Sequence, residues 1–219
     1  MIKYCIFDLD GTLLNTITSI TYYLNRTLEA HGISEITEEE CKIFIGDGAR
    51  KLVYRALESK GIRDSYICDR VLRDYNNAYH SDPFYLTSVY PGIPELIDRL
   101  KESGITIGVL SNKPENTARA VVEHFFGDNF SFVRGGREGI PLKPSPVSTF
   151  QMLDEMGGMP SELAFIGDTG VDIDTGKAVG AQLTVGVLWG FRTTAELRSH
   201  GADVIADSIE DIFLAVRGK

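Results

Sequence analysis

The chain has 219 residues, of which 43% are hydrophobic and 24% charged, a composition typical of a globular protein large enough to bury a core. Its formal net charge of −9 argues against a nucleic acid or an anionic membrane as partner. No apolar run reaches the roughly 18 residues of a membrane-spanning helix. The three cysteines (Cys5, Cys41, Cys68) form no CxxC pair and no cluster with histidine, which argues against a disulfide framework and a zinc site.

The first predicted element is an apolar strand over residues 3–8, at the very start of the chain. Such a start leaves no room for a signal peptide, so we expect a cytoplasmic protein. After Gly11 the pattern becomes helical for about 65 residues. One helix face carries apolar residues spaced 3, 4 and 4 apart: Ile17, Ile20, Leu24 and Leu28. Thr37 and Glu40 form a capping-box pattern ahead of a second helix, and this block contains no convincing strand.

From about residue 86 strands and helices alternate. The predicted strands are 105–110, 130–133, 163–166, 183–188 and 204–205. The predicted helices lie near 92–103, 115–126, 146–157, 171–180, 193–199 and 208–216. Continuous apolar strands between helices indicate a parallel sheet covered on both faces. We therefore predict an α/β, doubly wound, Rossmann-like core (residues 1–14 and 86–219) with an inserted all-helical cap domain (15–85) that acts as a lid on linkers near 15–19 and 83–87.

Reactive side chains stand at four places that we expect at strand ends. They are Asp8 with Asp10, Ser111-Asn112-Lys113, Lys143-Pro144-Ser145-Pro146, and Gly167-Asp168-Thr169 with Asp172. The carboxyl ends of the strands of such a sheet converge on one edge, where ligands bind. Two carboxylates as close as Asp8 and Asp10 resist joint ionisation unless a cation or a shared proton relieves them. A nucleophile, a hydroxyl, an ammonium group and a further carboxylate are what phosphoryl transfer through an aspartyl-phosphate requires, with Mg²⁺ as the expected cofactor.

These motifs carry a resemblance to a known family. Asp8-Leu9-Asp10-Gly11-Thr12-Leu13 with Thr16, Ser111-Asn112-Lys113-Pro114, Lys143-Pro144-x-Pro146 and Gly167-Asp168-Thr169-x-x-Asp172 resemble the four motifs of the haloacid dehalogenase superfamily, in order. Tyr90-Pro91-Gly92 and Asn112-Lys113-Pro114 resemble its phosphoglycolate phosphatase branch, which carries a helical cap between the first two motifs.

The resemblance implies a role for each residue. Asp8 would be the nucleophile and Asp10 the acid and base, and Mg²⁺ would be held by Asp8, the backbone carbonyl of Asp10, and Asp168. Ser111, the backbone around Asn112, and Lys143 would hold the phosphate. The supporting residues would be Thr12, Thr169 and Asp172, with Asp174 as an alternative to Asp172. Apart from the resemblance, Arg50 follows the loop Gly46-Asp47-Gly48, where it either lies at a solvated helix start or contacts the rest of the substrate. The same two possibilities stay open for Lys113.

The leading functional prediction is a Mg²⁺-dependent phosphoric monoester hydrolase that acts on a small phosphorylated metabolite of the phosphoglycolate type. The alternative is a β-phosphoglucomutase-like phosphomutase or a pyrophosphatase, which would share all four motifs. A dehalogenase is disfavoured because displacing a halide needs neither a metal nor the carboxylate of Asp10. A signalling receiver domain is disfavoured because it spans only about 120 residues, keeps its acids adjacent and has no helical insertion. Trp189 is expected to pack near the rim of the site, and the sequence gives no indication of the oligomeric state.

Overall fold

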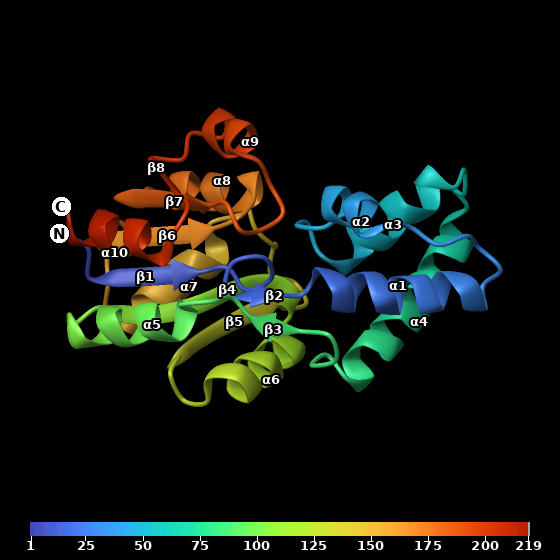
Figure 1. The fold of residues 1–219 in the computed structure, drawn as a ribbon, viewed down its shortest axis with the longest axis horizontal. Coiled ribbons are helices and arrows are strands. Elements are labelled where there is room, and N and C mark those ends of the chain that lie inside the picture. The colour runs from blue at the N-terminus through green and yellow to red at the C-terminus, as the bar shows by residue number, and fades with distance from the viewer. Residues whose placement is uncertain (219) are drawn as a thin grey trace. The chain divides into compact units, whose positions relative to one another are not determined.

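The computed structural model describes residues 1–218 and divides into two compact units (Figure 1). The core unit comprises residues 1–15 together with the chain from Val89 onward, and the helical unit comprises Thr16–Ser88. The sequence places this insertion at 15–85. The described part of the chain contains no helix that is long and apolar enough to cross a bilayer.

The core unit is built on a six-stranded sheet in the order β5-β4-β1-β6-β7-β8. Its strands are β1 (Tyr4–Phe7), β4 (Thr106–Pro114), β5 (Phe132–Gly136), β6 (Leu163–Gly167), β7 (Leu183–Val187) and β8 (Val204–Ala206). All neighbouring strands are parallel, and Tyr4 of β1 pairs with Thr106 on one side and Leu163 on the other. The chain builds outward from β1 in both directions, so the carboxyl end of β1 is the switch point at which open α/β sheets bind ligands.

Helices pack against this sheet (Figure 1). They are α5 (Ile93–Glu102), α6 (Glu115–Phe126), α7 (Val147–Met156), α8 (Gly170–Val179), α9 (Thr194–Ser199) and α10 (Ile209–Arg217), with a 3₁₀ turn at Pro160–Glu162. On the face covered by α7 and α8, one core cluster joins sheet and helix residues: Ile6, Leu110, Met152, Leu153, Leu163, Phe165 and Val179. Cys5, Ile6 and Phe7 are all fully buried, which explains why β1 reads as a continuous apolar run. The predicted doubly wound α/β class with a helical insertion is confirmed.

β5 lies two to three residues later than the predicted 130–133, and two further differences bear on the site and its surroundings. β4 continues to Pro114, four residues beyond its predicted end, and its pairing with β5 is irregular between Leu110 and Pro114. The motif Ser111-Asn112-Lys113 therefore lies in the last part of the strand instead of after it. A second small sheet pairs β2 (Leu14–Asn15) with β3 (Ser88–Val89), and strands of two residues are too short for an alternation pattern to reveal.

The helical unit consists of α1 (Ile17–Ala30), α2 (Glu38–Phe44), α3 (Ala49–Ser59) and α4 (Ser65–Ser81). The predicted apolar face of α1 is buried, and α1 packs against α2 and α4. The predicted capping box is present, because the side chain of Thr37 accepts a hydrogen bond from Glu40 N–H while the Glu40 carboxylate accepts one from Thr37 N–H.

Candidate active site

Three predicted site residues meet at the carboxyl end of the central strands. Asp8 follows β1 directly, Asp172 lies in the first turn of α8, and Lys143 comes from the loop between β5 and α7. Lys143 Nζ lies 2.7 Å from Asp8 Oδ1 and 2.7 Å from Asp172 Oδ1. Burial would lower the pKa of Lys143, but the charges of Asp172 and Asp8 outweigh burial and raise it, so the ammonium group stays protonated. A permanent positive charge is thus held against Asp8.

Asp168, directly after β6, completes a group of buried carboxylates. Asp8, Asp168 and Asp172 each offer an oxygen, and these oxygens lie within 4.8 Å of one another. Burial raises the pKa of Asp8 to about 7, even though Lys143 opposes the shift. Burial and then the charges of Asp172 and Asp8 raise the pKa of Asp168 well above its usual value. Three carboxylates against one ammonium group leave an excess of negative charge, and this all-oxygen set of donors fits a hard divalent cation.

The hydrogen bonds of Asp172 show which of these carboxylates is already engaged. Its Oδ1 contacts Lys143, and its Oδ2 accepts hydrogen bonds from the Thr169 N–H (3.0 Å) and hydroxyl (2.7 Å). Asp174, the alternative left open by the sequence, instead pairs with His200 at 2.9 Å. Asp172 is therefore the residue that holds Lys143, while Asp8 and Asp168 keep free acceptor capacity.

Asp10 points to a different partner. Its Oδ2 lies 3.0 Å from Lys113 Nζ, and the Lys113 side chain is only 5% exposed. Its Oδ1 is buried and accepts no hydrogen bond within the described chain. The side chain of Asp10 does not belong to the group of converging carboxylates, so of the three predicted metal residues the structure brings together the side chains of Asp8 and Asp168.

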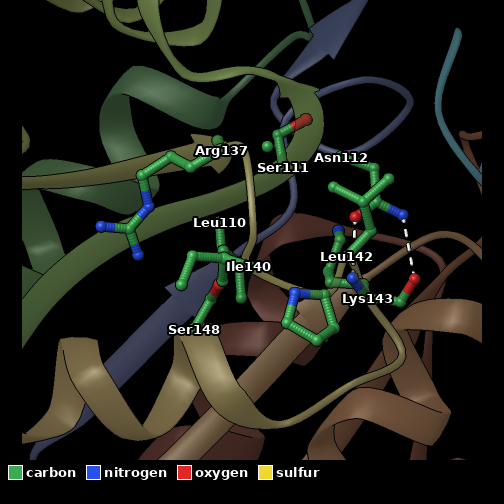
Figure 2. A pocket seen from close by; sticks show the side chains of 11 residues that line it. Leu110, Ser111, Asn112, Arg137, Ile140, Leu142, Lys143 and Ser148 are labelled. Carbon is green, nitrogen blue, oxygen red and sulfur yellow. Dashed lines mark hydrogen bonds between the residues drawn. The ribbon is translucent and has the colours of Figure 1, made fainter.

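The end of β4 fixes the loop that carries Lys143. Asn112 Oδ1 accepts from the Lys143 backbone N–H (2.9 Å) and Asn112 Nδ2 donates to the Lys143 carbonyl (3.2 Å), as Figure 2 shows. Ser111 Oγ accepts from the Lys113 N–H at 3.2 Å. Ser111, Asn112 and Lys143 line one pocket together with residues of the loop after β5 (Figure 2). The side chain of Asn112 thus positions Lys143, a role that its place in the motif did not reveal.

Arg50 is placed in the helical unit, among residues of α3 and α4. Its guanidinium lies 3.0 Å from Asp69 Oδ1 and donates to the Tyr54 hydroxyl at 2.7 Å. The same group stacks over the Tyr54 ring, 4.7 Å from the ring centroid. Contacts inside the helical unit therefore account for this side chain.

The sequence predicts Trp189 near the rim of the site, but it did not reveal what the segment Trp189-Gly190-Phe191 after β7 contacts. Trp189 Nε1 donates to the Thr12 carbonyl at 3.0 Å, so its side chain does more than pack at the rim. The Phe191 N–H donates to Asp168 Oδ2 at 2.8 Å. A glycine between two aromatic residues, directly after a predicted strand, was the signal that could have pointed to it.

Comparisons with known proteins show which family the chain belongs to. Residues 5–186 match the model of a family described as haloacid dehalogenase-like hydrolase. The phosphoglycolate phosphatase of Rhodospirillum rubrum is 35% identical over 191 residues, which cover 84% of this chain and 79% of that protein. The phosphoglycolate phosphatase of Aquifex aeolicus is 32% identical, over 86% of each chain. A crystal structure from Lactobacillus delbrueckii subsp. bulgaricus, of a proposed phosphoglycolate phosphatase, has a TM-score of 0.94 and 31% identity, with 99% of both chains covered. The chain belongs to the haloacid dehalogenase-like hydrolase family, as its four motifs predict.

Proposed function

We propose that this protein is a Mg²⁺-dependent phosphatase that hydrolyses a small phosphorylated metabolite of the phosphoglycolate type through a phosphoryl group carried on Asp8. The predicted class, a phosphoric monoester hydrolase, is confirmed by the family and by the relatives. The observation that carries the proposed mechanism is the convergence of Asp8, Lys143 and Asp168 at the end of the central strands.

Asp8 is the proposed nucleophile. Lys143 holds its Oδ1, which orients the carboxylate and leaves Oδ2 to attack phosphorus. The attack forms an acyl phosphate on Asp8 and breaks the bond from phosphorus to the substrate oxygen. Water then attacks phosphorus, releases inorganic phosphate and restores the carboxylate. Splitting the displacement into two steps in this way is the usual gain of covalent catalysis.

Asp10 is the proposed acid and base. As an acid it protonates the departing substrate oxygen, and as a base it then takes a proton from the attacking water. Its buried Oδ1 has no partner in the described chain and is free to make this contact. The ion pair with Lys113 fixes the other oxygen, so the carboxyl group is held in one orientation.

The proposed metal ligands are Asp8, Asp168 and the backbone carbonyl of Asp10. When bound, Mg²⁺ would supply positive charge that neutralises the phosphoryl oxygens and the buried carboxylates. Lys143 adds a fixed charge, and Ser111 with the backbone around Asn112 would donate to the phosphoryl oxygens. Thr12, Thr169 and Asp172 hold Asp168 and Lys143 in place.

We also propose a residue that contacts the substrate and a compartment for the enzyme. The buried ammonium of Lys113 beside Asp10 would bind the carboxylate of a phosphoglycolate-type substrate. We place the enzyme in the cytoplasm because all three cysteines are free and buried, which suits a reducing compartment. The phosphomutase and pyrophosphatase alternatives are not favoured, since the relatives are named phosphatases.

A panel of phosphorylated metabolites, assayed with Mg²⁺ and with a chelator, tests the proposal. We expect release of inorganic phosphate from phosphoglycolate in preference to sugar phosphates and pyrophosphate, and none in the chelator. Isomerisation of a sugar phosphate without net phosphate release would point to a mutase and overturn the proposal. Full activity in the chelator would overturn the metal dependence.

A further inference from the structure

We infer that the turn Trp189-Gly190-Phe191 is a positioning element that holds the Asp168 carboxylate in the orientation needed to bind the divalent cation. The turn follows β7, which is not among the strands that carry the four motifs. The inference rests on the proposed function, because it takes Asp168 as a metal ligand.

The first observation is how the oxygens of Asp168 are occupied. Asp168 is fully buried, and each of its oxygens accepts one hydrogen bond from the fold. Oδ1 accepts from the Thr12 hydroxyl at 3.2 Å, and Oδ2 accepts from the Phe191 N–H at 2.8 Å. A carboxylate oxygen can accept more than one hydrogen bond or metal contact, so these two donors set the plane of the group and still leave capacity for a cation.

The second observation is that two glycines enclose the same carboxylate. A Cβ atom on Gly190 would lie 2.3 Å from Asp168 Cβ, 2.5 Å from Asp168 Oδ2 and 2.5 Å from the Gly11 carbonyl oxygen. A Cβ atom on Gly11 would lie 2.3 Å from Asp168 Oδ2. Only residues without a side chain allow both backbones to approach so closely. Any side chain at position 190 must displace Asp168, the turn, or the backbone at Gly11.

The third observation ties this turn to the loop after β1. Trp189 Nε1 donates to the Thr12 carbonyl at 3.0 Å, and the hydroxyl of the same Thr12 donates to Asp168. Trp189 therefore holds the residue that holds Asp168, while Phe191, two residues further on, contacts Asp168 directly. Thr12, Asp168 and the turn Trp189-Gly190-Phe191 are therefore joined to one another in a closed cycle of hydrogen bonds.

Hydrogen-bond partners that orient a metal-binding carboxylate increase the affinity of the site for the metal. Loss of such a partner typically weakens metal binding by about 10- to 100-fold. A role limited to packing would lower thermal stability without a specific loss of affinity. The two roles are therefore separated by measuring Mg²⁺ affinity and melting temperature on the same variants.

The experiment is a calorimetric titration of the purified protein with Mg²⁺ alone, in wild type, Gly190→Ala and a control variant, Gly180→Ala. Gly180 ends α8 with φ of +76°, and a Cβ atom there would meet no atom within 4 Å. Ala at this position is strained in its backbone but lies in open space, so it destabilises the fold without touching the site. Asp168→Asn shows that the titration reports this site.

We expect Gly190→Ala to raise the Mg²⁺ dissociation constant by about 10- to 100-fold, and Gly180→Ala to leave it unchanged while lowering the melting temperature. Trp189→Phe keeps an aromatic ring but lacks the donor to Thr12, and should weaken Mg²⁺ binding in a protein that stays folded. Wild-type affinity in folded Gly190→Ala would overturn the inference. If Gly190→Ala does not fold, wild-type affinity in Trp189→Phe would overturn it. A wild-type protein that does not bind Mg²⁺ would overturn both this inference and the metal site of the proposed function.

Discussion

Lys113 Nζ lies 3.0 Å from Asp10 Oδ2, in an ion pair whose lysine side chain is 5% exposed and whose aspartate is 16% exposed. Lys113 comes from the end of β4 and Asp10 from the loop after β1, two neighbouring strands of the sheet. Burying an ammonium group this deeply costs desolvation free energy, which a surface ion pair would not require. The pair places a positive charge beside the group that is proposed to protonate the leaving oxygen.

Lys113→Met should therefore separate substrates by their charge. It keeps the length of the side chain and removes the ammonium group. If Lys113 binds the substrate carboxylate, kcat/KM for phosphoglycolate should fall by about 10- to 100-fold more than for a phosphomonoester without a carboxylate, the range expected for a hydrogen bond to a charged group. Equal losses for both substrates would show that Lys113 acts only through Asp10.

Asp8→Asn should abolish turnover, with kcat reduced by at least about 10³-fold, because the amide is not a nucleophile. In the wild-type enzyme, acid quenching during turnover followed by peptide mass spectrometry should find a phosphoryl group on Asp8. The folded state of Asp8→Asn is checked by circular dichroism. Substantial activity in this variant, or a phosphoryl group on another residue, would contradict the proposed mechanism.

The raised pKa of Asp8 predicts a pH-dependent effect on stability. Burial raises this pKa to about 7, above the ordinary value of about 4, so the folded state binds a proton more readily than the unfolded state. The contribution of Asp8 to stability is then full below about pH 4, declines between about pH 4 and pH 7, and is lost above about pH 7. In a chelator, Asp8→Asn should melt above the wild type at pH 8, with the difference shrinking toward pH 5, because Asn removes a charge that burial disfavours while Lys143 keeps Asp172 as its partner.

The melting temperature measured with Mg²⁺ tests whether Asp8 is a metal ligand. The cation should raise the melting temperature of the wild type at pH 8, since a ligand that binds only the folded state stabilises it. Asp8→Asn should respond less. A wild type that melts above Asp8→Asn in chelator at pH 8 would contradict the assigned electrostatics, and an equal response to Mg²⁺ would contradict the assigned ligand.

Lys143→Ala should be strongly destabilising as well as inactive. It leaves Asp8 and Asp172 without their shared buried partner, and removing one member of a buried ion pair costs about 3–5 kcal/mol of unfolding free energy. The matched control is Lys177→Ala, which breaks the pair with Asp203, where both side chains are about 40% exposed. That exposed pair should contribute about 0–1 kcal/mol. Urea denaturation measures both variants, and similar losses would contradict the assignment.

The helical unit is proposed to act as a lid, and proteolysis of the linker at 83–87 tests this proposal. Leu86 lies between α4 and β3 with φ of 55°, a conformation that is unfavourable for a leucine. Tyr85 beside it is 46% exposed, so chymotrypsin should cleave here. Mg²⁺ with orthovanadate should slow this cleavage and leave cleavage at Tyr66, 71% exposed at the start of α4, unchanged. Unchanged cleavage at both positions would count against closure.

The predicted linker at the start of the helical unit overlaps the first helix. The sequence suggests 15–19 as one linker, but α1 already begins at Ile17. Only the residues before Ile17 are available to absorb a backbone change at this end. Helix ends are set by backbone geometry that the apolar spacing of Ile17 and Ile20 does not specify.

The pattern of apolar and polar residues along the chain was enough to predict the fold class of this protein and the position of Asp8 at the end of the first strand. The apolar run before Asp8 predicts β1 because a strand covered on both faces must be apolar throughout, and the spacing of Ile17, Ile20, Leu24 and Leu28 predicts the buried face of α1. These patterns depend on neighbours along the chain, which is why the sequence is enough to read them.

Only the tertiary structure decided which side chains meet. It placed Asp172 and not Asp174 against Lys143, and it brought Gly190 against Asp168 from the turn after β7, a strand outside the four motifs. It also turned Asn112 toward the backbone of Lys143. Such contacts join residues far apart in sequence and follow from strand order, register and the paths of the loops. No spacing rule along the chain contains that information, because approach in space is set by the packing of the whole sheet and its helices.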